Sequence, residues 1–194
     1  MENVNSLCEH SSKIKIPKSR IDSMLREHKI WFDKREEILS GKREESDLGN
    51  QNTGRFLIRL DDIYQSDCDY TEINLKDAFL SDCVFINVDM SLSDFSNSIL
   101  SNSDLTKNIF FGSNFRDSKM ENVDFYKSDL RGVDFENAKL TMSCFDGCDL
   151  RSAKFTTEII DIESFCFCKV SKRHLPWLAL HPEFHDIYPT LKVY

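Results

Sequence analysis

A period of five residues runs through the middle of this chain. From Leu60 to Phe165 it marks 22 positions, and 21 of them carry a large apolar side chain, with Gln65 as the exception. An α-helix repeats every 3.6 residues and a β-strand every two, so neither element produces this spacing. The period therefore predicts a repeat architecture in which each five-residue unit contributes one large side chain to a shared core.

A second column of residues lies two positions before the large apolar one and is small or β-branched. The residue between the two columns is often Asp or Asn, so that residues 103–105 and 128–130 read Ser-Asp-Leu and 148–150 read Cys-Asp-Leu. This unit resembles that of the pentapeptide-repeat family, A(D/N)LXX, closely over residues 68–165 and loosely over 55–67. The resemblance implies an all-β fold. It is a right-handed quadrilateral parallel β-helix, a solenoid of about five coils, whose large and small columns point inward.

Four units close one coil of such a tube, so residues twenty apart should stack. Sorted in this way, Phe concentrates on two opposite sides and Leu or Met on the other two. The five-residue period does not impose this segregation, which therefore supports a four-sided tube independently. The two Phe-rich stacks are Leu75, Phe95, Phe115, Phe135, Phe155 and Phe85, Leu105, Phe125, Phe145, Phe165.

Open ends of a β-helix expose unpaired backbone groups, so the segments on either side of the repeat are expected to cap it. We divide the chain into a disordered or extended tail (1–18), an N-terminal capping helix (19–42), a linker (43–54), the β-helix (55–168) and a C-terminal helical cap or dimerisation segment (169–194). In the last segment, apolar side chains either fold over the final coil or form a homodimer contact. They include Trp177, Leu178, Phe184, Ile187 and Tyr188.

Composition argues against catalysis and against a secreted or membrane-spanning chain. The seven Cys are an odd number, four of them (Cys68, Cys83, Cys148 and Cys168) replace Ala or Ser in the inward column, and reduced thiols indicate the cytoplasm. No apolar run is long enough to span a bilayer. The pair His181 and His185 lacks the spacing of a metal-binding motif, and the Asp column lies on a convex surface. We expect no enzyme activity, no cofactor and no metal.

Charge is concentrated in the repeat. The chain carries a formal net charge of -8, and residues 55–165 hold 21 acids against 11 bases. Such a field repels nucleic acid, so no direct nucleic-acid binding is expected. One side should present an acidic ridge of Asp69, Asp89, Asp129 and Asp149, interrupted by Ile109.

The opposite side is predicted to be the partner-binding face, because it replaces acids with apolar and basic residues. Its column reads Phe79, Ile99, Lys119, Lys139 and Ile159, with Met142 and Ile162 nearby. A smaller rival patch of Leu92, Ile109 and Phe111 lies on the side of the acidic ridge.

Three functions follow from these surfaces. The first is a non-catalytic bacterial protein-binding or scaffold module with a protein partner. The second comes from the resemblance, since some family members mimic B-DNA, bind DNA gyrase or topoisomerase and protect it from quinolones or toxins. A tube of about five coils covers less than one turn of duplex, which counts against mimicry. The third is a secreted bacterial effector, because the first 18 residues are polar.

Overall fold

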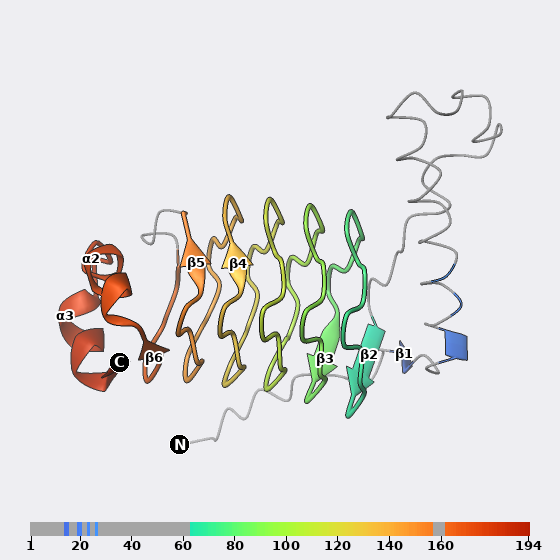
Figure 1. Cartoon of the computed structure of the whole chain (residues 1–194), viewed down its shortest axis with the longest axis horizontal. Coiled ribbons are helices and arrows are strands. Elements are labelled where there is room, and N and C mark those ends of the chain that lie inside the picture. The colour runs from blue at the N-terminus through green and yellow to red at the C-terminus, as the bar shows by residue number, and fades with distance from the viewer. Residues whose placement is uncertain (1–13, 16–18, 21–22, 24–25, 27–62, 157–161) are drawn as a thin grey trace, which may run out of the picture.

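The computed structural model describes residues 14–15, 19–20, 23, 26, 63–156 and 162–194. Within these ranges the coils lie side by side along the long axis of the molecule, and two short helices lie beyond the last coil (Figure 1). The strands are β1 (Ile14–Lys15), β2 (Ile63–Ser66), β3 (Val84–Ile86), β4 (Asp134–Phe135), β5 (Lys154–Phe155), β6 (Lys169–Val170) and β7 (Lys192–Val193). The helices are η5 (Lys172–His174), α2 (Leu175–Leu178), α3 (Phe184–Ile187) and η6 (Tyr188–Thr190).

Parallel pairing between residues twenty apart builds the solenoid. On one side, bridges join Asp69 to Asp89, Asp89 to Ile109, Ile109 to Asp129 and Asp129 to Asp149. The other three sides follow the same rule, as Asn74 with Asp94, Phe79 with Ile99 and Val84 with Asp104 show. The described repeat is therefore a parallel β-helix, as predicted from the five-residue period.

A tight turn separates neighbouring sides, and its second residue adopts the left-handed conformation. Values of φ near 60° recur every five residues, for example at Asn102 (60°), Leu92 (59°) and Met142 (58°). Asn, Asp and Gly tolerate this region best, which explains why they fill most of these positions. The turn chemistry, rather than solvation alone, thus selects the polar residues of the repeat.

The Asp or Asn before each large residue has a structural role of its own. Its Oδ1 atom accepts a hydrogen bond from the backbone N–H two residues further on, as between Asp94 and Ser96 (2.9 Å) or Asp104 and Thr106 (3.0 Å). This Asx-type contact fixes the start of the turn. The Asp-rich column is therefore needed by the backbone before it offers anything to a partner.

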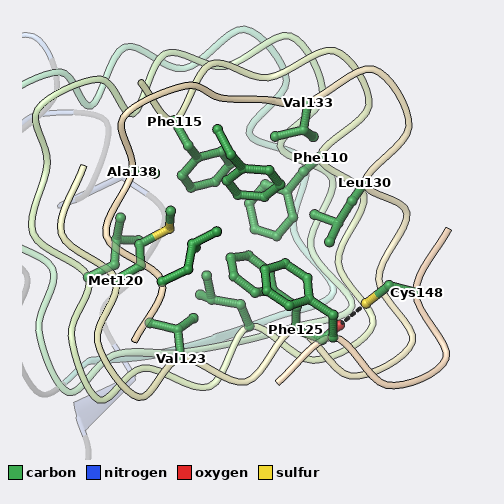
Figure 2. Packing of buried hydrophobic residues seen from close by; sticks show 14 of the residues in the cluster. Phe110, Phe115, Met120, Val123, Phe125, Leu130, Val133, Ala138 and Cys148 are labelled. Carbon is green, nitrogen blue, oxygen red and sulfur yellow. Dashed lines mark hydrogen bonds between the residues drawn. The ribbon is translucent and has the colours of Figure 1, made fainter. Parts of the chain in front are cut away.

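Aromatic ladders fill the tube (Figure 2). Phe95 and Phe115 stack with their centroids 4.6 Å apart, and Phe115–Phe135 and Phe135–Phe155 continue the ladder at 5.5 and 5.1 Å. The opposite ladder meets it edge-on, as Phe115 and Phe125 do at 6.2 Å. Both arrangements are favoured by the ring quadrupole and leave no room for solvent inside the tube.

Buried hydroxyl groups link successive coils through the small column. Ser113 accepts a hydrogen bond from the backbone N–H of Ser93 (3.1 Å) and donates one to the carbonyl of Met90 (2.7 Å). These two groups belong to one turn of the preceding coil, which Ser113 therefore closes. The same bridge is made by Ser93, Ser103, Asn108, Ser128 and Ser143.

Both ends of the described solenoid carry an added strand. β1 pairs in parallel with β2 through Ile14–Ile63 and Lys15–Tyr64, so part of the predicted N-terminal tail is ordered against the first coil. At the other end β7 pairs with β6. Of the predicted N-terminal helix, residues 19, 20, 23 and 26 are helical, and its remainder and the linker lie outside the described residues.

The last coil departs from the regular repeat. Glu163 occupies the small inward position before Phe165, yet its side chain is exposed, and Ile162 is buried in its place at 3% exposure. A carboxylate cannot enter an apolar tube unpaired, so the neighbouring apolar residue fills the space. The expectation that Ile162 adds to an outer face is therefore wrong.

The hydroxyl bridge predicts unequal effects for two buried serines. Ser113→Ala leaves the Ser93 N–H and the Met90 carbonyl without this partner and should cost about 1–3 kcal/mol of unfolding free energy. Ser118 is equally buried, but its hydroxyl bonds only the carbonyl of Phe115, which the Ser118 N–H also contacts. Ser118→Ala should cost less than about 1 kcal/mol. Urea unfolding of both variants measures the difference, and equal losses would contradict the bridge.

Candidate interaction surfaces

Side chains on four outer sides are what this solenoid presents to other molecules, because its interior is filled. We name each side by its first described large residue: the Tyr70, Leu75, Leu80 and Phe85 sides. Along each side, residues of one column lie about 4.8 Å apart. A side is thus a flat array of straight columns, and its chemistry can be read column by column.

The Leu80 side holds the predicted partner-binding face. Phe79 and Ile99 are half-buried, whereas Lys119 and Lys139 are exposed. Bridges join the four residues in succession, so they form one continuous column that changes from apolar to basic. Met142, 56% exposed, lies in a turn on this side. Ile159 lies outside the described residues.

The Tyr70 side carries the predicted acidic ridge, and the structure shows it to be partly neutralised. Arg131 binds Asp129 through two nitrogens, with Nη2 2.6 Å from Oδ2. Arg151 binds Asp149 in the same way at 2.7 Å, and Lys169 Nζ lies 3.6 Å from Asp149. The ridge therefore keeps its negative character at Asp69 and Asp89 and loses it toward the C-terminal end.

The environment of Asp149 favours its ionised form. Burial by itself would raise the pKa of this carboxyl, but hydrogen bonds from Arg151 and the charges of Arg151 and Lys169 hold the pKa below its usual range. Asp134 on the Leu75 side has a lowered pKa for similar reasons: burial is outweighed by the Glu136 N–H and by Lys154 and Arg116. These carboxylates act as structural ion-pair partners.

A different acidic cluster lies on the Phe85 side, and the sequence analysis did not single it out. Burial raises the pKa of Asp124, and repulsion from Asp104, Asp146 and Glu163 raises it further. Burial also raises the pKa of Cys144 to about 11, so this thiol is protonated at neutral pH. Sorting the sequence by twenties could have found the cluster, since 104 and 124 share one column.

The rival apolar patch is more exposed than the predicted face. Leu92, Ile109 and Phe111 are 54%, 41% and 47% exposed, and the guanidinium of Arg131 lies 5.4 Å from the centre of the Phe111 ring. Phe79 and Ile99 are each less exposed than these three. Exposed apolar groups on the described coils thus gather on the Tyr70 side as well as at Met142 on the Leu80 side.

The C-terminal residues predicted to form a cap or a dimer contact divide into two groups. Leu178 and Ile187 are buried at 1% and 3% exposure, and Trp177 stacks on Phe155 with centroids 4.4 Å apart. Phe184 is half-buried and lies 5.3 Å from the ring of Tyr188, which is 48% exposed. Trp177 therefore extends the aromatic ladder by one ring.

Two shallow hollows mark the outer surface. One, of about 290 Å³, is lined by Lys154, Phe155, Arg173, His174 and Trp177 together with Ala153. His174 Nε2 lies 2.9 Å from the carbonyl of Ala153, and burial lowers the pKa of this imidazole. The second hollow, of about 330 Å³, lies among the charged residues of the Tyr70 side.

Nowhere in the described residues do three or more His, Cys, Asp or Glu side chains gather as a metal site would require. His181, which the sequence pairs with His185, places Nε2 2.9 Å from the carbonyl of Ile162 and so supports the last coil. Within the same part of the chain, no helix combines the length and apolarity needed to cross a membrane.

Comparison with known proteins identifies the repeat. The family model described as pentapeptide repeats (8 copies) matches residues 66–102, 89–125 and 118–156. The chain belongs to the pentapeptide repeat family, and the family fold is the right-handed β-helix. No curated protein matches the chain.

Several solved structures are similar to this chain. HetL, a pentapeptide repeat protein involved in heterocyst differentiation regulation from the cyanobacterium Nostoc sp. strain PCC 7120, is 19% identical, with 60% of this chain and 46% of HetL covered and a TM-score of 0.44. QnrB1, a plasmid-mediated fluoroquinolone resistance protein, is 21% identical, with 58% and 65% covered and a TM-score of 0.30.

A pentapeptide repeat protein from the Arabidopsis thaliana thylakoid lumen is 18% identical, with 50% of this chain and 72% of its own covered and a TM-score of 0.40. The chain spans less than two thirds of HetL and of QnrB1. At these scores the likenesses carry no argument about function.

The opposite pKa shifts of Asp149 and Asp124 predict opposite pH behaviour. Ionised Asp149 stabilises the fold above its unfolded pKa of about 3.9, and this contribution is lost as the pH falls through the lower folded value. Asp149→Asn keeps the turn-capping Oδ1 and should cost about 1 kcal/mol at pH 7, because Arg151 is partly exposed, and almost nothing near pH 2.

Asp124→Asn serves as the matched variant. Its raised folded pKa means that the ionised form costs stability at pH 7, a cost that disappears below the unfolded pKa. The substitution should therefore stabilise the protein at pH 7 and have little effect near pH 2. Urea unfolding at both pH values measures both effects, and a pH-independent loss in Asp149→Asn would disprove the ion-pair assignment.

Proposed function

We propose that this protein is a non-catalytic bacterial protein-binding or scaffold module that acts in the cytoplasm through the outer sides of a four-sided β-helix. The observation that supports it is the filled interior. Aromatic ladders occupy the tube and backbone groups bond between coils, so the described coils offer flat side-chain arrays instead of a deep pocket. Flat, rigid arrays suit recognition of a protein surface, since they lose little conformational entropy on binding.

The Leu80 side is the proposed binding face. Its column offers apolar contact at Phe79 and Ile99 and positive charge at Lys119 and Lys139. A partner that fits this order presents an apolar patch next to an acidic one. The exposed lysines steer such a partner electrostatically, and the apolar end supplies contact area.

A DNA-mimicking gyrase or topoisomerase ligand is the alternative, favoured by the surplus of acids over bases in residues 55–165. The pairing of Asp129 and Asp149 with Arg131, Arg151 and Lys169 weakens this alternative, because it removes half of the acidic ridge. Purified protein added to a gyrase supercoiling assay with a quinolone tests it. Protection at micromolar protein would replace the scaffold proposal, and its absence would exclude gyrase.

We propose that the C-terminal segment is a cap and not a dimer contact, since Leu178 and Ile187 are buried and Trp177 stacks on Phe155 within one chain. Trp177→Ala removes the last ring of the ladder and should cost about 2–4 kcal/mol of unfolding free energy, measured in urea. Tyr188→Ala, at an exposed ring, should cost less than about 1 kcal/mol. A concentration-dependent loss in Trp177→Ala would favour the dimer contact instead.

The binding face predicts a specific loss of partner capture. Ile99→Glu places a carboxylate in the apolar part of the Leu80 column and should abolish co-purification of the partner while circular dichroism stays unchanged. Ile109→Glu is the matched control, because Ile109 occupies the same position of the repeat on the opposite side. Quantitative pull-down compares them. Capture that survives Ile99→Glu, or that is lost in both variants, would refute this face.

A further inference from the structure

The Tyr70 side reverses its charge along the solenoid. Its described outward positions 69, 71, 72, 89 and 91 include three acids, Asp69, Glu72 and Asp89, and no base. Toward the C-terminal end, Arg131, Arg151 and Lys169 follow in the next coils beside Asp129 and Asp149. The side therefore has an acidic end and a basic end.

The apolar patch of Leu92, Ile109 and Phe111 lies between these ends. The Leu92 N–H donates to the carbonyl of Phe111 (2.9 Å), so the two residues are neighbours on adjacent coils. A Cβ atom added at Gly112 would lie 2.9 Å from Leu92 Cδ2, which shows that the leucine side chain extends over this glycine. The three exposed residues thus form a continuous apolar centre.

The basic end is held in place by the protein itself. Lys127, Arg131, Arg151 and Lys169 surround the 330 Å³ hollow together with Asp129 and Asp149, so four cations face two carboxylates. The two-nitrogen contacts fix Arg131 and Arg151, and the ring of Tyr194 lies 4.7 Å from the Arg151 guanidinium. Their side chains remain 44% and 36% exposed, so they reach a partner with little loss of entropy.

A face with this order is complementary to itself when two copies run in opposite directions. Consider a two-fold axis in the plane of the side, perpendicular to the solenoid and passing through Ile109. It places the coil of Arg131 opposite the coil of Asp89 in the second copy, and the coil of Arg151 opposite that of Glu72. The apolar centre meets its own copy. A parallel arrangement would place like charges together.

We propose that the Tyr70 side is an antiparallel homodimer interface, with the apolar centre on the two-fold axis and two sets of charge pairs flanking it. Such contacts are isologous, as most dimer interfaces are. About five coils of one side give an interface at the small end of specific complexes, which predicts a reversible dimer in the micromolar range that weakens with salt. This interface lies opposite the proposed binding face and does not depend on it.

Sedimentation equilibrium of the full chain tests the proposal. We expect a monomer–dimer equilibrium whose dissociation constant rises about tenfold between low and high salt. Leu92→Asn should weaken the dimer by about tenfold. Met142→Asn is the matched control and should leave it unchanged, because both residues are similarly exposed at the same left-handed turn position (φ 59° and 58°). A chain that stays monomeric at about 1 mM, or a dimer indifferent to Leu92→Asn, overturns the proposal.

Charge exchange tests the antiparallel direction. Glu72→Lys should weaken the dimer by about tenfold, and the double variant Glu72→Lys, Arg151→Glu should restore it, provided that circular dichroism shows both to be folded. A folded double variant that fails to restore association overturns the antiparallel arrangement. Ile99→Glu should lose the partner and keep the dimer, so the two proposals fail in different measurements.

Discussion

The backbone hydrogen bonds between residues twenty apart are the interaction on which this protein depends. Leu100 donates to Lys119 at 2.8 Å and Lys119 donates to Ser98 at 2.9 Å, and the same exchange recurs on every side. Each coil therefore satisfies the polar groups of its neighbours, and the inward side chains then stack in register without choice. The pairing also explains the ends, since β1 and β7 each add one more strand where pairing would otherwise stop.

Register explains why the chain could be read so far from sequence alone. A strict spacing of five and twenty assigns each residue to a side and to the inside or outside, so the Phe ladders, the acidic ridge and the opposite apolar-basic column follow by counting. The irregular coil at Ile162 and Glu163 could not be found in this way. Counting assumes that the phase holds, whereas the cost of burying a carboxylate decides the outcome there.

Counting also fails to give what long side chains do. Arg131 and Arg151 lie two residues after the aspartates they bind, and the turn brings the guanidinium back over the carboxylate. Sequence sorting by columns separates these residues and so reads the ridge as uniformly acidic. The buried serines present the same difficulty, because Ser113 reads as a small filler while its partners lie twenty and 23 residues earlier. Position is encoded in the period, but hydrogen-bond partners are not.

The square cross-section gives the two proposed surfaces a relation to each other. The Tyr70 and Leu80 sides are two turns apart in a four-sided coil and therefore face in opposite directions. A dimer formed through the Tyr70 side would leave both Leu80 sides outward, so that one dimer presents two copies of the binding face. A partner with two matching sites, or two partners fixed in one assembly, would then be held by both faces at once, and the second contact would form at high effective concentration. A modest affinity on each flat side would suffice for a scaffold built in this way.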